Sequence, residues 1–497
     1  MNSPSKIKIQ QSKATLLFFC IIAVLTINAN AQFKDTAPTS KHGTLTIGTQ
    51  FVTNFSGFNN NLPFWLQADH YGLYDPHSGN GLLTARFYQP VTSDKNFSIY
   101  TSGMVAGRAA DRSWAGLPFL SATLNYGILQ FRAGRFSDPL GTNYHPLSSG
   151  SMVYSTNAMP VPKIMVKTRG FVDIPYTRGH AQFSAYLSHG WLEKSRYAKN
   201  AYLHQKYLYL KINYKMFEGI GGIVQNVQWG GTSPGYGQLP DSFNDYLRMV
   251  FSQNAEKNSS APSSEKTNAV GNTVGGYDFN LRVNLNRFTL SFYRLFYLED
   301  EISIRFRSPW DGMWGGAYIS KSPHPFLKAF LYEHINTKRQ NSFDWQAWGD
   351  DNYYNNSVYR SGWTYNNRVL GNPLLLTDGS QTSPIYNSII VAHHIGANGF
   401  ITPNLQWKAF YTFSRNYGRS GDQRIPGTKH TENGHTVYDL RPLSSLKKIN
   451  HSLYISTAYT PPRHDRFQFE LGLAGDFGQL YDRDRLGIMF GASYRIY

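Results

Sequence analysis

Apolar residues recur at every second position in the last stretch of the chain. Leu486, Ile488 and Phe490 fall on one face of an extended strand, and Gly491 and Ser493 fall on the other. Successive side chains of a strand point to opposite faces, so this stretch predicts a strand with one apolar face and one small or polar face. A strand of an outer-membrane β-barrel has lipid on one side and a polar lumen on the other. The last strand of a soluble sandwich also alternates, so the rest of the chain must decide.

The same two-residue period recurs along the chain. In one segment, Phe279 and Leu281 alternate with Asn280 and Arg282. A face of Asn and Arg suits a wet lumen better than a dry sandwich core. Such segments, separated by turns rich in Gly, Asp, Asn and Pro, predict roughly 16 to 20 strands, and barrels of this kind have even counts. Further strands are predicted at residues 44–54, 82–91, 97–108, 119–126, 129–136, 164–173, 181–191, 206–214, 385–401, 405–414, 453–459 and 467–477.

Three long segments interrupt this pattern. Residues 56–81 are rich in Asn, Gly, Asp and His with aromatic residues between them, and we expect them to plug or line a barrel mouth. Residues 241–253 have apolar residues three and four positions apart, which predicts one helix that caps or plugs the barrel. Residues 340–383 are loop-like and very aromatic. We therefore expect an all-β fold, a transmembrane antiparallel β-barrel with a small helical or irregular plug.

The N-terminal residues have the pattern of a secretory signal peptide. Lysines precede a short apolar core at residues 16–27, and residues 29–31 form an A-x-A cleavage site. We expect residues 1–31 to be removed and residues 32–497 to form the barrel with its inserted loops. No later apolar run approaches the ~20 residues that a membrane helix needs. A chain that enters lipid without such a helix must form a closed barrel, because lipid offers no partner for unpaired backbone groups.

Composition supports a membrane barrel and indicates its partners. Aromatic residues make up 15% of the chain and charged residues 16%, whereas a soluble chain carries about a quarter charged residues. The formal net charge of +17 predicts attraction to polyanions, here lipopolysaccharide phosphates and acidic polysaccharide. Nucleic acid is not expected in this compartment. The only cysteine, Cys20, lies in the predicted signal peptide, so we expect no disulfide.

Three motifs resemble a known family. These are LHQKYLYL at residues 203–210, QWGG at residues 228–231 and YRSGWTYNNRVLGNPL at residues 359–374. Together they resemble the Wzi family of capsule-assembly proteins of the Gram-negative outer membrane. The resemblance implies a barrel of about 18 strands, blocked on its periplasmic side by helices. It also implies a lectin-like role in which the barrel binds and anchors capsular or other surface polysaccharide.

The aromatic loop carries the candidate glycan contacts. Aromatic faces pack on the C–H face of sugar rings, while Asp and Arg bond hydroxyls or carboxylates. The alternative is that these aromatic residues form an interface girdle or pack a plug. The predicted glycan-binding residues are Trp345, Trp348, Asp350, Asp351, Tyr353, Arg360, Trp363, Tyr365 and Arg368.

The sequence offers no convincing catalytic or metal site. Residues 231–235 match G-x-S-x-G, but Pro234 lacks the N–H that an oxyanion hole needs after the serine. His393 and His394 point to opposite faces of a strand and cannot hold one metal together. We expect a monomer that is not an enzyme, with no catalytic residue, no metal and no cofactor. The alternative function is an outer-membrane porin or substrate-specific channel.

Overall fold

The computed structural model describes residues 43–55, 61–77, 79–94, 96–142, 146–256, 261–267, 269–299, 308–340, 352–432 and 435–496. The predicted signal peptide, residues 1–31, lies outside them. Within the described residues, no helix is both long enough and apolar enough to cross a membrane.

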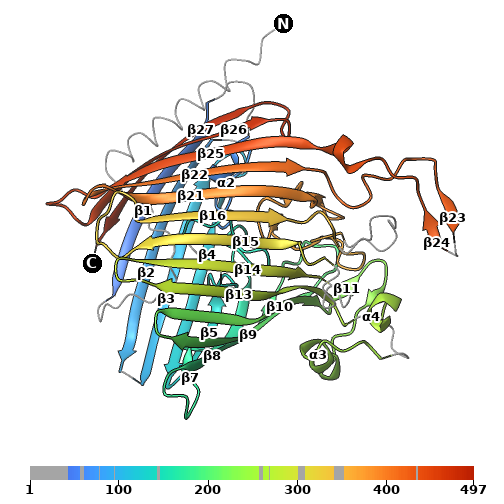
Figure 1. The fold of residues 1–497 in the computed structure, drawn as a ribbon, viewed down its shortest axis with the longest axis horizontal. Helices are drawn as coiled ribbons and strands as arrows, with labels where there is room; N and C mark the ends of the chain where they lie inside the picture. Colours follow the sequence, from blue (N-terminus) through green and yellow to red (C-terminus); the bar gives the residue numbers. More distant parts are fainter. Residues whose placement is uncertain are drawn as a thin grey trace, which may run out of the picture.

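Nineteen strands form one antiparallel sheet that closes on itself (Figure 1). The first strand pairs with the last, from Thr46 opposite Arg495 to Asn54 opposite Gly487. The strands are β1 (Thr44–Asn54), β2 (Asn80–Ser93), β3 (Phe97–Ala109), β4 (Trp114–Tyr126), β5 (Leu129–Arg135), β6 (Pro162–Thr168), β7 (Val172–Asp173), β8 (Ala181–Trp191), β9 (Tyr202–Tyr214), β10 (Phe217–Trp229), β13 (Asn272–Asn284), β14 (Phe288–Leu298), β15 (Gly312–Ser320), β16 (Ala329–Asn336), β21 (Ile390–Thr402), β22 (Leu405–Asn416), β25 (Lys448–Tyr459), β26 (Phe467–Gly478) and β27 (Arg485–Arg495).

The short strand β7 continues the path of β6, because both pair with β8. The wall is therefore an eighteen-stranded closed barrel, which confirms the predicted fold class. Short hairpins outside the wall are β11 (Thr232–Ser233) with β12 (Gly237–Gln238), β17 (Thr364–Tyr365) with β18 (Arg368–Val369), β19 (Leu376–Thr377) with β20 (Ile385–Asn387), and β23 (His430–Glu432) with β24 (His435–Val437). The helices are α2 (Phe64–Gln67), α3 (Phe243–Val250), α4 (Ser263–Thr267) and the 3-10 turn η2 (Leu443–Leu446).

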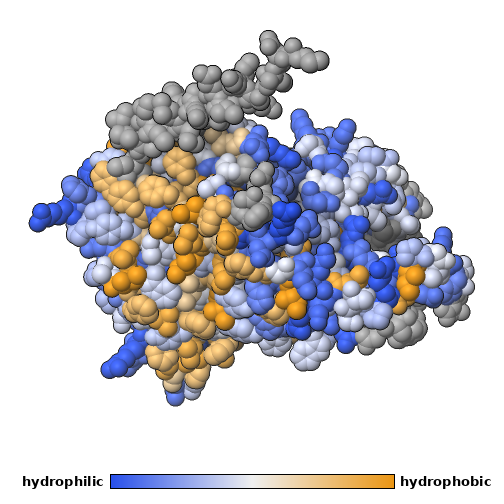
Figure 2. Space-filling model, turned by 90° about the horizontal axis from the view of Figure 1, so that it is seen from above, coloured by the Kyte–Doolittle hydropathy of each residue, from blue (hydrophilic) through white to orange (hydrophobic). Residues whose placement is uncertain are grey.

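The wall has the two faces that the sequence predicts. On β27, Phe490 is 46% exposed while Met489 is 1% exposed. On β13, Phe279 is exposed, whereas Asn280 is buried and accepts a hydrogen bond from Ser291 at 2.9 Å. Figure 2 shows hydrophobic residues gathered on one part of the outer surface, with hydrophilic residues toward the end that carries the long loops. The exposed apolar rows form the lipid-facing wall.

The two ends of the barrel differ in the length of their connections. At the end that carries both chain termini, strands are joined by short turns such as residues 127–128, 215–216 and 403–404. At the opposite end the connections are long, for example residues 230–271 and 337–389 (Figure 1). Outer-membrane barrels have short periplasmic turns and longer extracellular loops. The end with the termini therefore faces the periplasm, and the loop end faces outward.

Three connections from the loop end fold inward and fill the lumen. They are residues 61–77, which include α2, the described part of residues 136–161, and residues 352–389. The indole Nε1 of Trp363 donates to the carbonyl of Val153 at 2.9 Å, which joins two of these segments. We call the three segments the plug. In the described residues it is built from irregular loops, the helical turn α2 and the short hairpins β17–β18 and β19–β20, whereas the family resemblance implied helices at the periplasmic side.

The plug is bonded to inward-facing residues of the wall. The backbone N–H of Phe64 donates to Asp476 on β26 at 2.8 Å. The Ser149 hydroxyl donates to Glu333 on β16 at 2.6 Å. Buried carboxylates need such donors, because an unpaired buried charge is costly. These bonds hold the plug in one position inside the barrel.

Candidate functional site

The loop end carries basic side chains near tyrosine rings, and one of these rings, that of Tyr417, is itself buried. Each cation lies near the centroid of one ring, and the members of each pair come from connections or strand ends on the outward side of the barrel. The pairs are Arg360 over Tyr197 (5.2 Å), Lys338 over Tyr417 (5.6 Å), Arg424 over Tyr438 (5.2 Å) and Arg485 over Tyr481 (3.5 Å). We call these four pairs the outer basic–tyrosine surface.

Hydrogen bonds between loops fix the Arg360 pair. The Nε of Arg360 donates to the Ser357 carbonyl at 3.2 Å. The backbone N–H of Tyr197 donates to the Ser361 hydroxyl at 2.8 Å, so the loop after β8 is attached to the loop before β21. A guanidinium held over an aromatic face keeps donors free for a carboxylate. Such a pair can contact the ring and the carboxylate of an acidic sugar together.

The structure separates the predicted glycan-binding residues. Trp345, Trp348, Asp350 and Asp351 lie outside the described residues. Arg360 is exposed on the outer basic–tyrosine surface.

The remaining predicted residues lie inside the plug. Tyr353, Trp363 and Tyr365 are fully buried. Arg368 donates to the carbonyl of Tyr74 at 2.9 Å and holds the 61–77 segment in place. Their part in glycan binding stays a prediction, and their contacts in the structure are those of plug packing.

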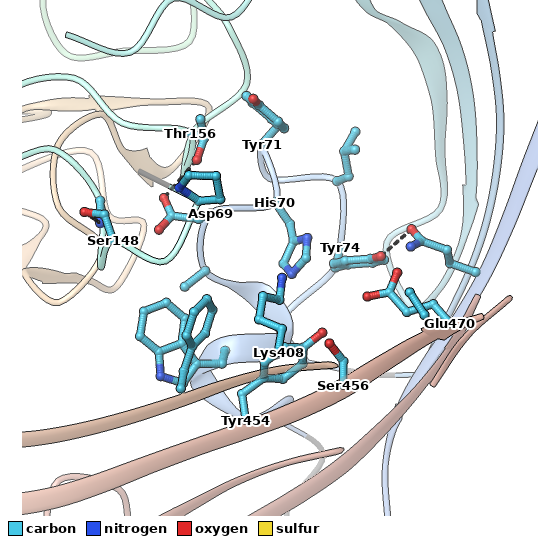
Figure 3. A pocket seen from close by; sticks show the side chains of 18 of the residues that line it. Asp69, His70, Tyr71, Tyr74, Ser148, Thr156, Lys408, Tyr454, Ser456 and Glu470 are labelled. Carbon is cyan, nitrogen blue, oxygen red and sulfur yellow. Dashed lines mark hydrogen bonds between the residues drawn. The ribbon is translucent and has the colours of Figure 1, made fainter. Parts of the chain in front are cut away.

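A second candidate site lies on the periplasmic side of the plug (Figure 3). It is a cavity of about 430 Å³ between the plug and the wall strands β1, β2, β22, β25 and β26. This volume falls in the range of ≈ 300–1,000 Å³ that small-ligand sites occupy. Its lining includes Asp69, His70, Tyr74, Lys408, Tyr454 and Glu470. We call it the inner pocket.

Lys408 is the cation of the inner pocket with the fewest partners. Its ammonium group lies 5.4 Å from the ring centroid of Tyr454 and 5.3 Å from that of Phe410. No hydrogen bond or ion pair among the described residues involves this group. Figure 3 shows Lys408 reaching from the wall toward His70 of the plug. A cation placed this way can bind an anionic solute.

Burial shifts the protonation of two plug residues in the pocket. Burial, with a smaller contribution from Glu333, raises the pKa of Asp69 to about 7, although Thr156 donates a hydrogen bond to its carboxylate at 3.2 Å. Burial, and then the nearby charge of Lys408, lowers the pKa of His70 to about 4. Between these values both side chains are uncharged. In this pH range the charged side chains of the pocket therefore belong mainly to the wall.

Sequence reasoning missed the inner pocket. Lys408 lies in a segment predicted as a strand, where an inward charge breaks an otherwise apolar and aromatic run. This charge is the sequence feature that could have indicated the pocket. Asp69 and Glu470 are about 400 residues apart in sequence, and no local pattern joins them.

Possible catalytic motifs have structural roles. His394 points inward, with its ring nitrogens 2.8 Å from Thr412 Oγ1 and Leu147 O, while His393 contacts the Tyr332 hydroxyl on the other face. The Ser233 hydroxyl is buried and donates to the Val358 carbonyl at 3.4 Å. Among the described residues, no cluster of His, Cys, Asp and Glu could hold a metal ion.

The family model for the capsule assembly protein Wzi matches residues 76–376, more than half of the chain. The chain belongs to the Wzi family. This Wzi-family barrel, with its lipid-facing wall, is a protein of the Gram-negative outer membrane. No curated protein matches its sequence.

Solved structures share the fold of this Wzi-family chain at low sequence identity. Wzi of Escherichia coli, described as a carbohydrate-binding β-barrel involved in group 1 capsule assembly, matches with a TM-score of 0.54 and 13% identity. The match covers 90% of this chain and 83% of that one. OccK5 (OpdH) of Pseudomonas aeruginosa matches with a TM-score of 0.47 and 10% identity over 92% and 99% of the two chains. The second score is too low to support an argument.

Proposed function

We propose that this Wzi-family barrel binds surface polysaccharide at its loop end and so anchors capsule to the outer membrane. The observation that carries the proposal is the outer basic–tyrosine surface, placed on the outward side of a barrel whose lumen is filled. The E. coli relative is described as carbohydrate-binding, which supports the same function here. Trp345, Trp348, Asp350 and Asp351 belong to the same connection as Arg360, and we include them in the proposed contact surface.

Three finer points belong to the proposal. The polysaccharide is acidic, because residues 32–497 carry a net charge of +14, the +17 of the whole chain less the three lysines of residues 1–31, and the paired cations suit carboxylates. The same positive charge should also attract the phosphate groups of lipopolysaccharide. The protein acts as a monomer and binds its glycan without cleaving it, so binding is not followed by turnover.

Purified protein in detergent, titrated with the capsular polysaccharide of its own strain, tests the proposal. Arg360→Ala removes one cation from the outer surface and should weaken binding roughly two- to fivefold, the value of an exposed cation–aromatic contact. Arg463→Ala, an exposed arginine in the periplasmic turn between β25 and β26, is the matched control. If the Arg360→Ala and Arg463→Ala variants bind the polysaccharide equally well, Arg360 is not part of the glycan site. Failure of the unaltered protein to bind any polysaccharide would overturn the function.

Deletion of the gene tests the anchoring role in cells. Capsule should appear in the medium while its synthesis continues, because an anchor acts after the polymer is made. Restoring the unaltered chain should return capsule to the cell surface, and the Arg360→Ala chain should return less. Cell-bound capsule that is unchanged by deletion would contradict the anchoring role.

The inner pocket favours a second function, a substrate-specific channel for small anions. Planar-bilayer conductance separates the two functions. The bonds between plug and wall should leave little open path, so an anchoring protein should conduct little, whereas a channel should conduct small anions. Under the anchoring function, Lys408→Met leaves polysaccharide binding unchanged, whereas in a channel it changes anion permeation. Lys215→Met, at the exposed turn between β9 and β10, controls for the loss of a positive charge.

A further inference from the structure

Helix α3 covers the outer face of the barrel wall and does not enter the lumen. Its Tyr246 contacts the rings of His204 on β9 and Trp229 on β10, each at 5.6 Å between centroids. These two rings point outward, because they alternate in step with the exposed residues Leu208 and Ile223 of the same strands. The space that remains inside the barrel is therefore bounded by the wall and by the plug.

The inner pocket opens toward the periplasm and is covered toward the loop end. Gln406 and Gln468 line it, and they are the second residues of β22 and β26 at the periplasmic ends of these strands. Gln406 is exposed. Farther along β22, Thr412 accepts a hydrogen bond at 3.2 Å from the indole of Trp65 in α2, so the plug covers the other end. A solute therefore reaches the pocket from the periplasm.

Lys408 stands in a row of polar side chains that crosses three strands. It lies directly opposite Asn398 of β21 and directly opposite Ser456 of β25. Residues paired in this way point to the same face, with Cβ atoms about 4.5–5.5 Å apart. All three line the inner pocket. The ammonium group thus has an amide on one side and a hydroxyl on the other, and these groups can bind one carboxylate together.

A second polar pair lines the pocket on the neighbouring strands. Glu470 of β26 and Gln50 of β1 pair with Gly491 of β27 from its two sides, and both are less than a tenth exposed. Because Gly491 has no side chain, the space between them stays open; a Cβ there would lie 3.6 Å from Gln50 Nε2. The Tyr74 hydroxyl donates to Gln50 Oε1, whereas Gln50 Nε2 has no hydrogen-bond partner among the described residues. A buried donor of this kind needs a partner, which a ligand can supply.

The charges and polar atoms of the pocket together fit one class of ligand. In the pH range in which Asp69 and His70 are uncharged, two cations, Lys408 and Arg86, face one carboxylate, that of Glu470. One net positive charge suits an anion with a single charge. A simple anion has no hydroxyl to donate to the carboxylate, and a neutral sugar leaves the ammonium group unpaired. A ligand with one carboxylate and several hydroxyls satisfies both.

We propose that the inner pocket is a periplasm-facing site for a small acidic sugar, whose carboxylate binds Lys408 and whose ring hydroxyls bind Gln50 and Glu470. Figure 3 shows Lys408 and Glu470 reaching into the same pocket from the wall. The rings of Phe410 and Tyr454, with centroids 5.3 and 5.4 Å from the ammonium group, offer apolar faces to the C–H side of the sugar ring. The volume of about 430 Å³ suits a mono- or disaccharide. The plug separates this site from the outer basic–tyrosine surface, so the proposal does not rest on polysaccharide binding there.

Calorimetric titration of the purified barrel tests the class of ligand. Galacturonate should bind, and each of three probes should bind at least about tenfold more weakly. Galactose lacks the carboxylate, whereas acetate and inorganic phosphate lack the ring hydroxyls. Equal binding of acetate or phosphate would show a site for simple anions, and equal binding of galactose would show that the carboxylate is not recognised. Either result, or no binding of galacturonate, would overturn the proposal.

Charge variants test the position of the sugar. Lys408→Met should weaken galacturonate binding roughly ten- to hundredfold, the effect of losing a charged hydrogen bond, and Lys408→Arg should restore most of it. Lys215→Met, at the exposed periplasmic turn between β9 and β10, is the charge control and should bind normally. Arg360→Ala should also bind normally. Loss of binding in Arg360→Ala with full binding in Lys408→Met would place the sugar at the loop end and overturn the proposal. A chain that binds galacturonate in the pocket but binds no polysaccharide would contradict the proposed function alone.

A pair of space-filling variants tests the pocket without changing a charge. Ala458→Phe, on the pocket side of β25, should abolish galacturonate binding by filling the space. Ala409→Phe, an outward-facing residue of β22 opposite the exposed Ile455, should leave it unchanged. Full binding by Ala458→Phe would show that the sugar lies elsewhere.

Thiol labelling tests the side from which the pocket opens. The only cysteine, Cys20, lies in the predicted signal peptide, so Gln406→Cys places a single thiol in the barrel. A polymer-linked maleimide that cannot cross the outer membrane should label this thiol only after the membrane is permeabilised, and galacturonate should slow the labelling. Lys199→Cys, exposed at the loop end, should be labelled on intact cells. Labelling of Gln406→Cys on intact cells would overturn the periplasmic opening.

Discussion

Two neighbouring plug residues in the inner pocket respond to pH in opposite directions. The pKa of Asp69 is raised to about 7, so the folded state favours its neutral form. The stability linked to Asp69 is fully present below its ordinary pKa near 4 and is lost as pH rises through 7. The pKa of His70 is lowered to about 4, so its contribution is lost as pH falls from 6.5 through 4. Between about pH 4 and 6.5 the two contributions change in opposite directions and largely cancel, so the stability of the plug should depend little on pH in this range.

Asp69→Asn should remove the loss of plug stability at higher pH. The variant keeps the shape of the side chain and has no charge to bury. We expect its plug to be more stable than the unaltered plug at pH 8, with the difference vanishing near pH 4. Hydrogen exchange of the Tyr71 amide, which donates to the Thr156 carbonyl at 2.7 Å, reports plug opening. A difference that does not depend on pH would contradict the raised pKa.

Trp363 supports the plug through both packing and a hydrogen bond. Trp363→Ala should destabilise the plug by about 3–5 kcal/mol, the usual cost of truncating a large buried aromatic residue. Protection of the Leu370 amide, which donates to the Trp363 carbonyl at 3.0 Å, should fall, while the barrel keeps its melting temperature. Trp310→Ala, at an exposed loop position, is the control and should change neither quantity. A plug with unchanged protection would contradict this packing role.

At the scale of elements, α3 can be detached without disturbing the wall. Ser242→Ala removes the hydroxyl that accepts the Asp245 N–H and should destabilise the helix by about 1 kcal/mol. Exchange of amides in residues 246–251 should speed up, while strands β8 to β10 stay protected. Ser445→Ala, in the loop before β25, is a control for loss of a hydroxyl outside α3. Slower or unchanged exchange in α3 would show that the cap contributes nothing.

The strands were predictable from sequence because their alternation is local. Phe279 and Asn280 differ in burial as their periodicity indicates, and the same holds for Phe490 and Met489. The place of α3 was not predictable. Its helical spacing is visible in sequence, but a helix that covers a wall and a helix that fills a lumen have the same apolar pattern.

The site was predictable only in part, for a related reason. An aromatic loop such as residues 353–365 can pack a plug or bind a glycan, and the sequence leaves both open. Burial of Trp363 and exposure of Arg360 depend on which segments fold beside them. The pairing of Arg360 with Tyr197 joins two connections that are distant in sequence, so spacing along the chain carries no sign of it.

At the scale of the whole molecule, wall and plug are separable in their hydrogen bonding. In the part of the chain that the structure describes, the ladders of the wall join strand to strand, and β1 pairs with both β2 and β27 through residues outside the plug. The plug bonds to wall side chains such as Asp476 and Glu333. Closure of the barrel therefore does not require the plug, whereas closure of the lumen does.

Replacing residues 63–75 with a flexible Gly/Ser linker of equal length should open the lumen and leave the wall folded. The segment carries α2 and half of the plug residues that line the inner pocket, so its loss should connect that pocket with the loop end. Single-channel conductance should rise from near zero to a measurable level, with heat-modifiable migration on gels unchanged. An equal-length replacement in residues 421–436, a loop between β22 and β25, should leave conductance low. A barrel that stays closed without residues 63–75 would show that the other two plug segments seal the lumen alone.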